Sequence, residues 1–202
     1  NLDYQFYISF VLTQIENLNL RFEVMDIFLD LIHMLIATNK IPVDVLIEKK
    51  FLENFLMMKT DQTFVNFVTT HEAIPHIILA IFKSPNCEDY RFSIVSKLVQ
   101  CSDVKLLNLL KQLCSCDFSL DILNLLLNHF EKSEIMELLI YEISNHQFSF
   151  NLFVQCNGFS FFDNILNNPK IDHNIVNSLV KIIGALTKFG PKPRIDEWIN
   201  SL

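Results

Sequence analysis

The chain has 202 residues, of which 50% are hydrophobic and 19% are charged, and its net charge is −7. A chain this apolar collapses around a core, which excludes intrinsic disorder, and three glycines with six prolines are too few for the tight turns of a β-sandwich. The acidic balance disfavours nucleic-acid binding, because phosphate recognition requires a basic face.

The elements that we predict are helices, because apolar residues recur at positions i, i+3, i+4 and i+7 along most of the chain. The first spans Arg21–Asn39 and ends before Pro42, which disfavours the α region at the residue before it. Two more helices are predicted over Asp44–Met58 and Asp61–Val68.

The sequence Thr69-Thr70-His71-Glu72 fits a capping box, in which a threonine hydroxyl caps a helix and a glutamate three positions later reaches back. We therefore expect a helix over Glu72–Lys83, ended by Ser84-Pro85. Eight more predicted helices follow with short connections: Glu88–Cys101, Asp103–Ser115, Ser119–Lys132, Ser133–Asn145, Ser149–Cys156, Gly158–Asn167, Asp172–Phe189 and Arg194–Asn200. The sequence thus predicts an all-α fold.

Two segments with the same order of features begin at Phe67 and at Phe153, 86 residues apart. In each segment the Phe-Val pair ends a short helix. A polar break follows, then an apolar helix closed by Ser-Pro or Asn-Pro, and then a long helix. The offset corresponds to two periods of about 43 residues, which is the period of armadillo and HEAT arrays.

The second segment resembles an armadillo-type repeat in Asn157-Gly158-Phe159-Ser160-Phe161-Phe162 and in the long helix that includes Asn174–Leu186. The resemblance extends over most of the chain and implies a right-handed α-solenoid of about four to five degenerate repeats. We expect residues 1–202 to form a single armadillo-like domain. Because the first residue is Asn1 rather than Met, we expect the chain to be an excerpt of a longer protein or a processed chain. Armadillo-like folds mostly serve as protein-binding scaffolds, and the resemblance implies that role here.

No arrangement of residues indicates catalysis. The pairs Glu72…His76 and Glu142…His146 have the spacing E-x-x-x-H rather than the E-x-x-H of di-iron bundles, so we interpret them as caps or surface pairs. The sequence contains no H-E-x-x-H, no glycine-rich phosphate loop and no G-x-S-x-G elbow. We predict no enzymatic activity, no cofactor and no metal.

The five cysteines are interpreted as reduced structural thiols, because their number is odd and Cys114-Ser115-Cys116 has no second pair at the spacing of zinc ligands. This use of cysteine predicts an intracellular protein, nuclear or cytoplasmic. No stretch is long and apolar enough to predict a transmembrane helix, so we expect no membrane contact.

The helix predicted over Asp172–Phe189 has an apolar face and a polar stripe formed by Asn174, Asn177, Lys181 and Lys188. The third helix of armadillo-like repeats lines the concave groove, so the resemblance implies that this stripe contacts a partner; an ordinary solvated face is the alternative. Phe159 and Phe161 belong to a phenylalanine-rich stretch that forms either core between repeats or aromatic anchors for a partner helix.

From these features we expect a non-enzymatic protein–protein interaction scaffold that binds a helix or peptide of a partner within a larger complex. Two alternatives stay open. A nucleic-acid-binding helical repeat would show a steep loss of affinity with salt. An architectural homodimerisation module would show a mass that rises with protein concentration.

Overall fold

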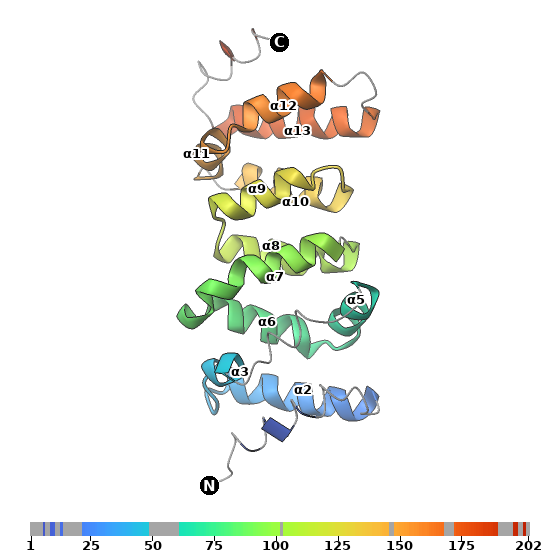
Figure 1. The fold of residues 1–202 in the computed structure, drawn as a ribbon, viewed down its shortest axis with the longest axis vertical. Coiled ribbons are helices and arrows are strands. Elements are labelled where there is room, and N and C mark those ends of the chain that lie inside the picture. Colours follow the sequence, from blue (N-terminus) through green and yellow to red (C-terminus); the bar gives the residue numbers. More distant parts are fainter. Residues whose placement is uncertain are drawn as a thin grey trace. The chain divides into compact units, whose positions relative to one another are not determined.

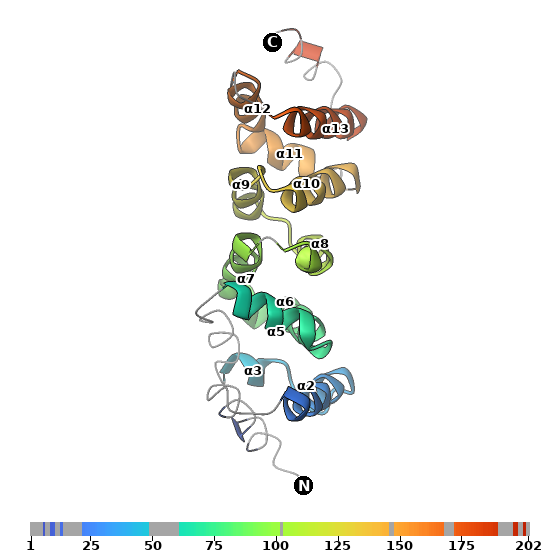
Figure 2. The same ribbon diagram turned by 90° about the vertical axis from the view of Figure 1, so that its right-hand side faces the viewer.

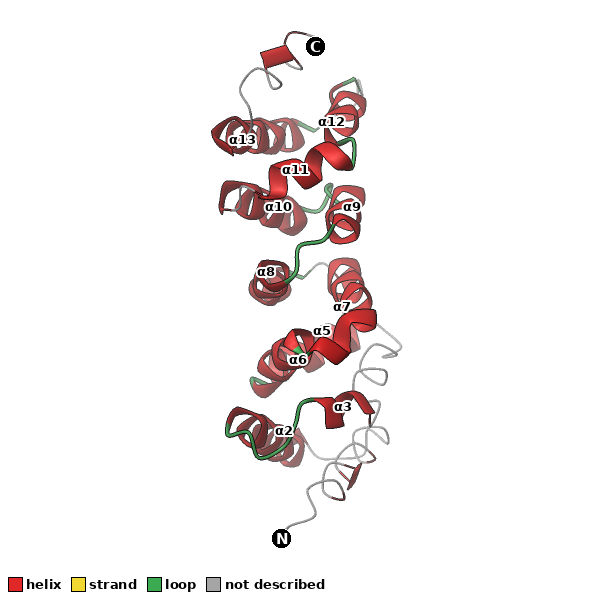
Figure 3. Cartoon of the chain, turned by 90° about the vertical axis from the view of Figure 1, so that its left-hand side faces the viewer, coloured by secondary structure: helices red, strands yellow, loops and turns green. Residues whose placement is uncertain are grey.

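The computed structural model describes residues 22–48, 61–101, 103–145, 148–167 and 172–189, together with a few isolated positions nearer the termini. Within these ranges every regular element is a helix and no strand occurs (Figure 3). The prediction of an all-α fold is therefore confirmed. The chain divides into two compact units, Asn1–Leu109 and Leu110–Leu202.

Unit 1 contains five α-helices and two short 3₁₀ segments among its described residues (Figure 1): α2 (Phe22–Ala37), α3 (Asp44–Glu48), α5 (Asp61–Thr70), α6 (Ala73–Lys83), η1 (Pro85–Cys87), α7 (Glu88–Cys101) and η2 (Val104–Leu106). Helix α6 packs along α2, and α5 contacts both α6 and α7. Leu29 and Ile32 of α2 and Ile74, Ile77 and Ile78 of α6 are completely buried, so the apolar faces of these two helices form the centre of the unit.

Helix α2 ends two residues earlier than its predicted boundary because Asn39 leaves the right-handed helical region. Its φ angle is 53°, a left-handed conformation that asparagine tolerates better than most residues. The N–H of Lys40 donates to the carbonyl of Leu35 at 2.8 Å, which satisfies one of the carbonyls left at the helix end.

The C-terminal end of α6 is held by a polar network at Ser84, where the sequence predicts the helix stop. The Ser84 hydroxyl donates to a carboxylate oxygen of Asp44 in α3 at 2.6 Å. Arg91 of α7 donates to the carbonyls of Phe82 at 3.0 Å and Ser84 at 3.3 Å. These bonds tie α3, α6 and α7 together in unit 1.

Helix α8 (Leu107–Cys116) begins in unit 1 and continues into unit 2. The other helices of unit 2 are α9 (Leu120–Asn128), α10 (Ser133–Asn145), α11 (Phe148–Gln155), α12 (Gly158–Leu166) and α13 (His173–Phe189). Within this unit α10 and α13 lie in one layer, and α9 and α12 lie in a second (Figure 2). The largest helix–helix packing of the unit joins α10 to α13.

Helix boundaries in unit 2 follow local hydrogen bonds. The Ser119 hydroxyl accepts from the N–H of Ile122 at 3.3 Å, which confirms the predicted start of α9. The predicted helix extends to Lys132, whereas α9 ends at Asn128, where the chain enters a turn. Of the other predicted helices, Asp44–Met58 lies in the described residues only as far as Glu48, and most of Arg194–Asn200 lies outside them.

The two segments that are 86 residues apart share one packing relationship and differ in the next. Helix α5 packs on α6, and α11 packs on α12, as the repeated order of features predicts. The long helix that follows differs, because α13 packs on α10 whereas α7 packs on α5. Among the residues that the structure describes, the repeat in the sequence therefore corresponds to a shared helix pair.

Candidate functional site

Helix α13 carries the four polar residues that the sequence predicts as a partner-binding stripe. It begins at His173, where the Asp172 carboxylate accepts from the N–H of Asn174 at 2.8 Å. Its apolar face packs on α10, with Leu179, Ile182 and Leu186 buried. The opposite side of the helix is therefore the one that a partner can reach.

The structure places all four predicted residues on this accessible side: Asn174, Asn177, Lys181 and Lys188 are exposed. They recur three, four and seven positions apart, so they follow one side of the helix. Gly184 lies between the two lysines, and a Cβ built on it would have no neighbour within 4 Å. Substitution of Gly184 by alanine is therefore sterically free.

The charge of α13 differs in sign from that of the chain. Its sequence, HNIVNSLVKIIGALTKF, contains two lysines and no Asp or Glu, whereas the whole chain has a net charge of −7. Val180 is 61% exposed beside Lys181. A helix surface that combines lysines with an exposed aliphatic side chain suits an acidic partner that also brings apolar groups.

The structure does not join Phe159 and Phe161 to the α13 stripe by any described ring contact. Both are half-buried residues of α12. The Phe159 ring meets the Phe153 ring edge to face at a centroid distance of 5.2 Å, and Phe161 meets Phe130 in the same way at 5.1 Å. Phe162, the residue after Phe161, is buried. These contacts support the interpretation as core, and a role in partner binding stays a prediction.

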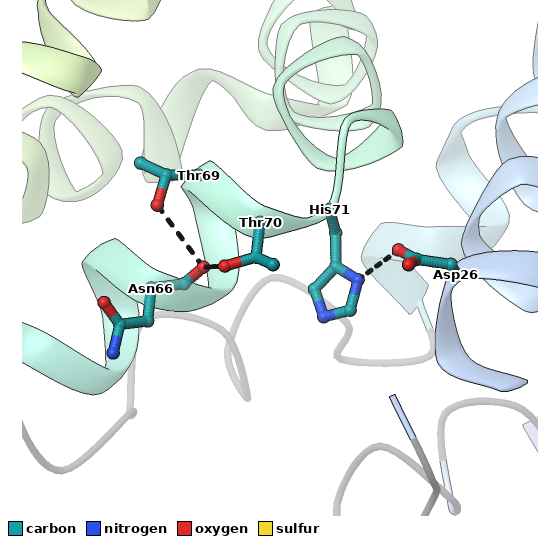
Figure 4. Close-up of polar contacts among 5 residues, drawn as sticks. All are labelled: Asp26, Asn66, Thr69, Thr70 and His71. Atoms are coloured by element: carbon teal, nitrogen blue, oxygen red, sulfur yellow. Dashed lines mark hydrogen bonds and ion pairs between the residues drawn. The ribbon is translucent and has the colours of Figure 1, made fainter. Parts of the chain in front are cut away.

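A second cluster of polar side chains lies at the packing of α2 on α6 in unit 1. His71, between α5 and α6, is 2% exposed, and its Nδ1 contacts a carboxylate oxygen of Asp26 in α2 (Figure 4). The Phe67 ring packs edge to face on His71. His33 of α2 stacks on His76 of α6 with a centroid distance of 4.8 Å and an angle of 6°.

The predicted capping box at the start of α6 is wrong. Thr69 and Thr70 belong to α5, which runs to Thr70 rather than ending at Val68. Their hydroxyls donate to carbonyls one turn back. Thr69 donates to Val65 at 2.8 Å and more weakly to Asn66 at 3.5 Å, and Thr70 donates to Asn66 at 2.5 Å; Figure 4 shows the two bonds to Asn66. Glu72 occupies the N-cap position of α6 without a side-chain capping bond. Inside a helix a threonine hydroxyl can donate to the carbonyl four residues earlier, and Thr69 and Thr70 make that bond instead of capping α6.

Glu142 of α10 is buried rather than a cap or surface residue, which corrects the interpretation from its spacing to His146. Its side chain is completely inaccessible, and burial raises its pKa to about 7, with a smaller opposing effect from a hydrogen bond of the Ser115 side chain. His146 lies outside the described residues. The signal was present in the sequence, because position 142 follows Ile135, Leu138 and Leu139 on the apolar stripe of α10.

The cysteines do not form a chemical centre. Cys87 and Cys114 are buried, Cys116 is exposed, and Cys101 and Cys156 are intermediate. Burial raises the pKa of the Cys87 thiol to about 11 and that of Cys114 still further, which disfavours the reactive thiolate. Among the residues whose placement is described, no group of three or more His, Cys, Asp or Glu side chains could hold a metal ion.

In the described helices, none combines the length and the apolar character needed to cross a membrane. Comparison of the chain with family models, with characterised proteins and with solved structures gives no match.

Proposed function

We propose that the chain is a right-handed α-solenoid of about four to five armadillo/HEAT-like repeats, and that it acts as a non-enzymatic scaffold binding a helix or peptide of a protein partner. The observation that carries the proposal is the cationic, exposed side of α13 in a chain of net charge −7. The expected partner segment is acidic and amphipathic, because it meets Lys181, Lys188 and Val180 together.

Packing within each unit supports the solenoid part of the proposal. In unit 1 the long helix α2 packs along α6, and in unit 2 the long helix α10 packs along α13. Stacking of successive long helices is how repeat arrays bury a continuous core. The same stacking leaves the outer sides of these helices available, and binding requires no covalent chemistry from them.

The position of the site on a helix also supports a binding role. Residues of α13 are held by its packing on α10, with Leu179 and Leu186 at most 1% exposed, so the polar stripe is fixed in space before a partner arrives. A preorganised surface loses less conformational entropy on binding than a mobile loop. The thiol state of the five cysteines fits a partner in the nucleus or cytoplasm.

The test compares capture of partners by the 202-residue chain and by two double variants from a nuclease-treated lysate. Lys181→Glu with Lys188→Glu reverses the charge of the α13 stripe, and Lys40→Glu with Lys105→Glu is the matched control, because Lys40 and Lys105 are also exposed. We expect one stoichiometric protein to be retained by the wild type and the control and lost by the α13 variant.

The magnitude follows from the loss of two partly desolvated ion pairs, about 1–3 kcal/mol, which weakens binding by roughly one to two orders of magnitude. Retention of the same protein by the α13 variant, with helical content unchanged by circular dichroism, would remove this stripe from the interface. Loss of all captured protein on nuclease treatment would show instead that nucleic acid is the ligand.

A further inference from the structure

Helix α2 has an apolar stripe that is not used in its packing on α6. Ile27 is 66% exposed and Met34 is 53% exposed, and half-buried Leu31 lies between them at helical spacing. Positions i, i+4 and i+7 share one side of a helix, so the three side chains form a continuous stripe. The buried side of α2, with Leu29 and Ile32, faces away from it.

Helix α13 has an apolar stripe of the same spacing. Val180 is 61% exposed, and Val176 and Ile183 are half-buried. These positions also follow the pattern i, i+4 and i+7, and Lys181 and Lys188 lie beside them on the exposed side. Each stripe consists of three side chains along about two turns of one helix, an arrangement that suits the packing of one helix on another.

The charges that accompany the two stripes have opposite signs. The sequence of α2, FEVMDIFLDLIHMLIA, contains Glu23, Asp26 and Asp30 and no Lys or Arg, whereas α13 contains two lysines and no acid. Asp30 is exposed and lies three positions from Ile27, on the same side of α2. An acidic side chain therefore lies beside the apolar stripe of α2, as the lysines lie beside that of α13.

We propose that the acidic helix bound by α13 is α2 of a second copy of this chain. This inference rests on the proposed function and names the partner segment of the same site. The apolar stripes pack together, and the lysines of one copy face the carboxylates of the other. Such a contact joins two different surfaces, so the two end copies of an assembly keep one open α2 and one open α13, and association continues to longer assemblies.

A single helix-on-helix contact buries less than the roughly 1,600 Å² of a standard stable interface, so we expect micromolar affinity. Sedimentation equilibrium of the complete 202-residue chain, from about 5 to about 200 µM, covers that range. The expected result is a mass that rises with concentration above the 23.6 kDa of one copy, and that falls when salt screens the lysine–carboxylate pairs.

Two variants make the test specific, because each removes one of the two surfaces. Val180→Glu places a charge in the apolar stripe of α13 and leaves the stripe of α2 unchanged. Ile27→Glu does the reverse. Each variant alone should be monomeric. An equimolar mixture should form dimers of twice 23.6 kDa and stop there, because each variant supplies the surface that the other lacks. Val104→Glu, at a residue that is 65% exposed in η2, should associate like the wild type.

Three results would overturn the proposal: a wild type that stays monomeric over the whole range, an Ile27→Glu variant that still associates, or a mixture that fails to form dimers. Circular dichroism checks that each variant folds, and Lys181→Glu with Lys188→Glu replaces Val180→Glu if that variant does not. The broader scaffold proposal fails differently. The scaffold proposal holds if a monomeric wild type captures a protein that the Lys181→Glu, Lys188→Glu variant loses. It is wrong if that variant captures the protein as well as the wild type does.

Discussion

The Phe153 ring lies against the backbone of Gly158, so closely that a Cβ built on the glycine would overlap three of the ring carbons. Asn157, immediately before it, has a left-handed φ of 56°, and this sharp turn brings α12 back onto α11. Phe153 itself is fully buried and contacts the rings of Phe159 and Phe162. The absence of a side chain at position 158 therefore determines how two helices of unit 2 pack.

Gly158→Ala should destabilise the protein by about 1–3 kcal/mol, the usual cost of overpacking a filled core. Gly184→Ala is the matched control, because Gly184 is also helical but its Cβ position is open. That variant should stabilise by roughly 0.5–1 kcal/mol through helix propensity. Urea titrations measure the free energy of unfolding of both variants. Equal changes in Gly158→Ala and Gly184→Ala would show that the Phe153 ring does not restrict position 158.

Glu142 should make stability depend on pH. Burial raises the pKa of this carboxyl to about 7, above its value in an unfolded chain, so the folded state binds the extra proton. The contribution of this group to the free energy of unfolding should therefore be complete below about pH 4.5, the unfolded pKa, and should be lost as the pH rises through the folded pKa of about 7, by roughly 1–3 kcal/mol.

Glu142→Gln should remove most of that pH dependence, because glutamine stays neutral while keeping the shape of the side chain. Glu137→Gln is the control: Glu137 is exposed on the same helix and accepts from Lys111 at 2.6 Å. Urea titrations between pH 4.5 and 8 measure the difference. A Glu142→Gln variant with the same slope as the wild type would show that the carboxyl does not titrate in this range.

Asp26 should contribute to the packing of α2 on α6 through His71. Asp26→Ala leaves a buried imidazole without its carboxylate, and we expect a loss of about 0.5–2 kcal/mol. Asp30→Ala removes an exposed acid four positions along the same helix and should change stability by less than about 0.5 kcal/mol. Similar effects of the two substitutions would argue against a specific role for the Asp26–His71 contact.

Asn39 should tolerate glycine better than alanine. Its φ of 53° lies where a Cβ is costly, so Asn39→Ala should destabilise by about 1 kcal/mol, whereas Asn39→Gly should be neutral or slightly stabilising. Thermal unfolding of the two variants in parallel provides the measurement. An alanine variant as stable as the glycine variant would mean that the chain leaves α2 in another conformation.

The helices of this chain could be predicted well because apolar spacing alone encodes them. The start of α9 at Ser119 and the stop of α6 at Ser84-Pro85 were predicted, and in the structure both serine hydroxyls accept from a backbone N–H two or three residues later. The exposure of Asn174 and Lys181 followed from the phase of α13. Each of these features depends on residues within one or two turns of each other, which is the range that sequence reasoning covers.

Features that depend on distant residues could not be predicted in this way. His33 stacks on His76 across 43 positions, and nothing near either residue indicates the other. Glu142 is a different case, because its burial follows from its place on the apolar stripe of α10, whereas its interpretation as a cap or surface residue rested on its spacing to His146. Thr69 and Thr70 were misassigned because the same hydroxyl can cap a following helix or bond back into its own, and the tertiary packing decides which.

The distribution of thiols has a practical consequence for measuring how the two units behave. Cys87 is buried in unit 1 and Cys114 is buried in unit 2, and a buried thiol reacts with an alkylating reagent only when its surroundings open. The rate at which each of these two cysteines is modified therefore reports the opening of its own unit. Equal modification rates at Cys87 and Cys114 would indicate that the two units open together, and unequal rates would indicate that each opens independently.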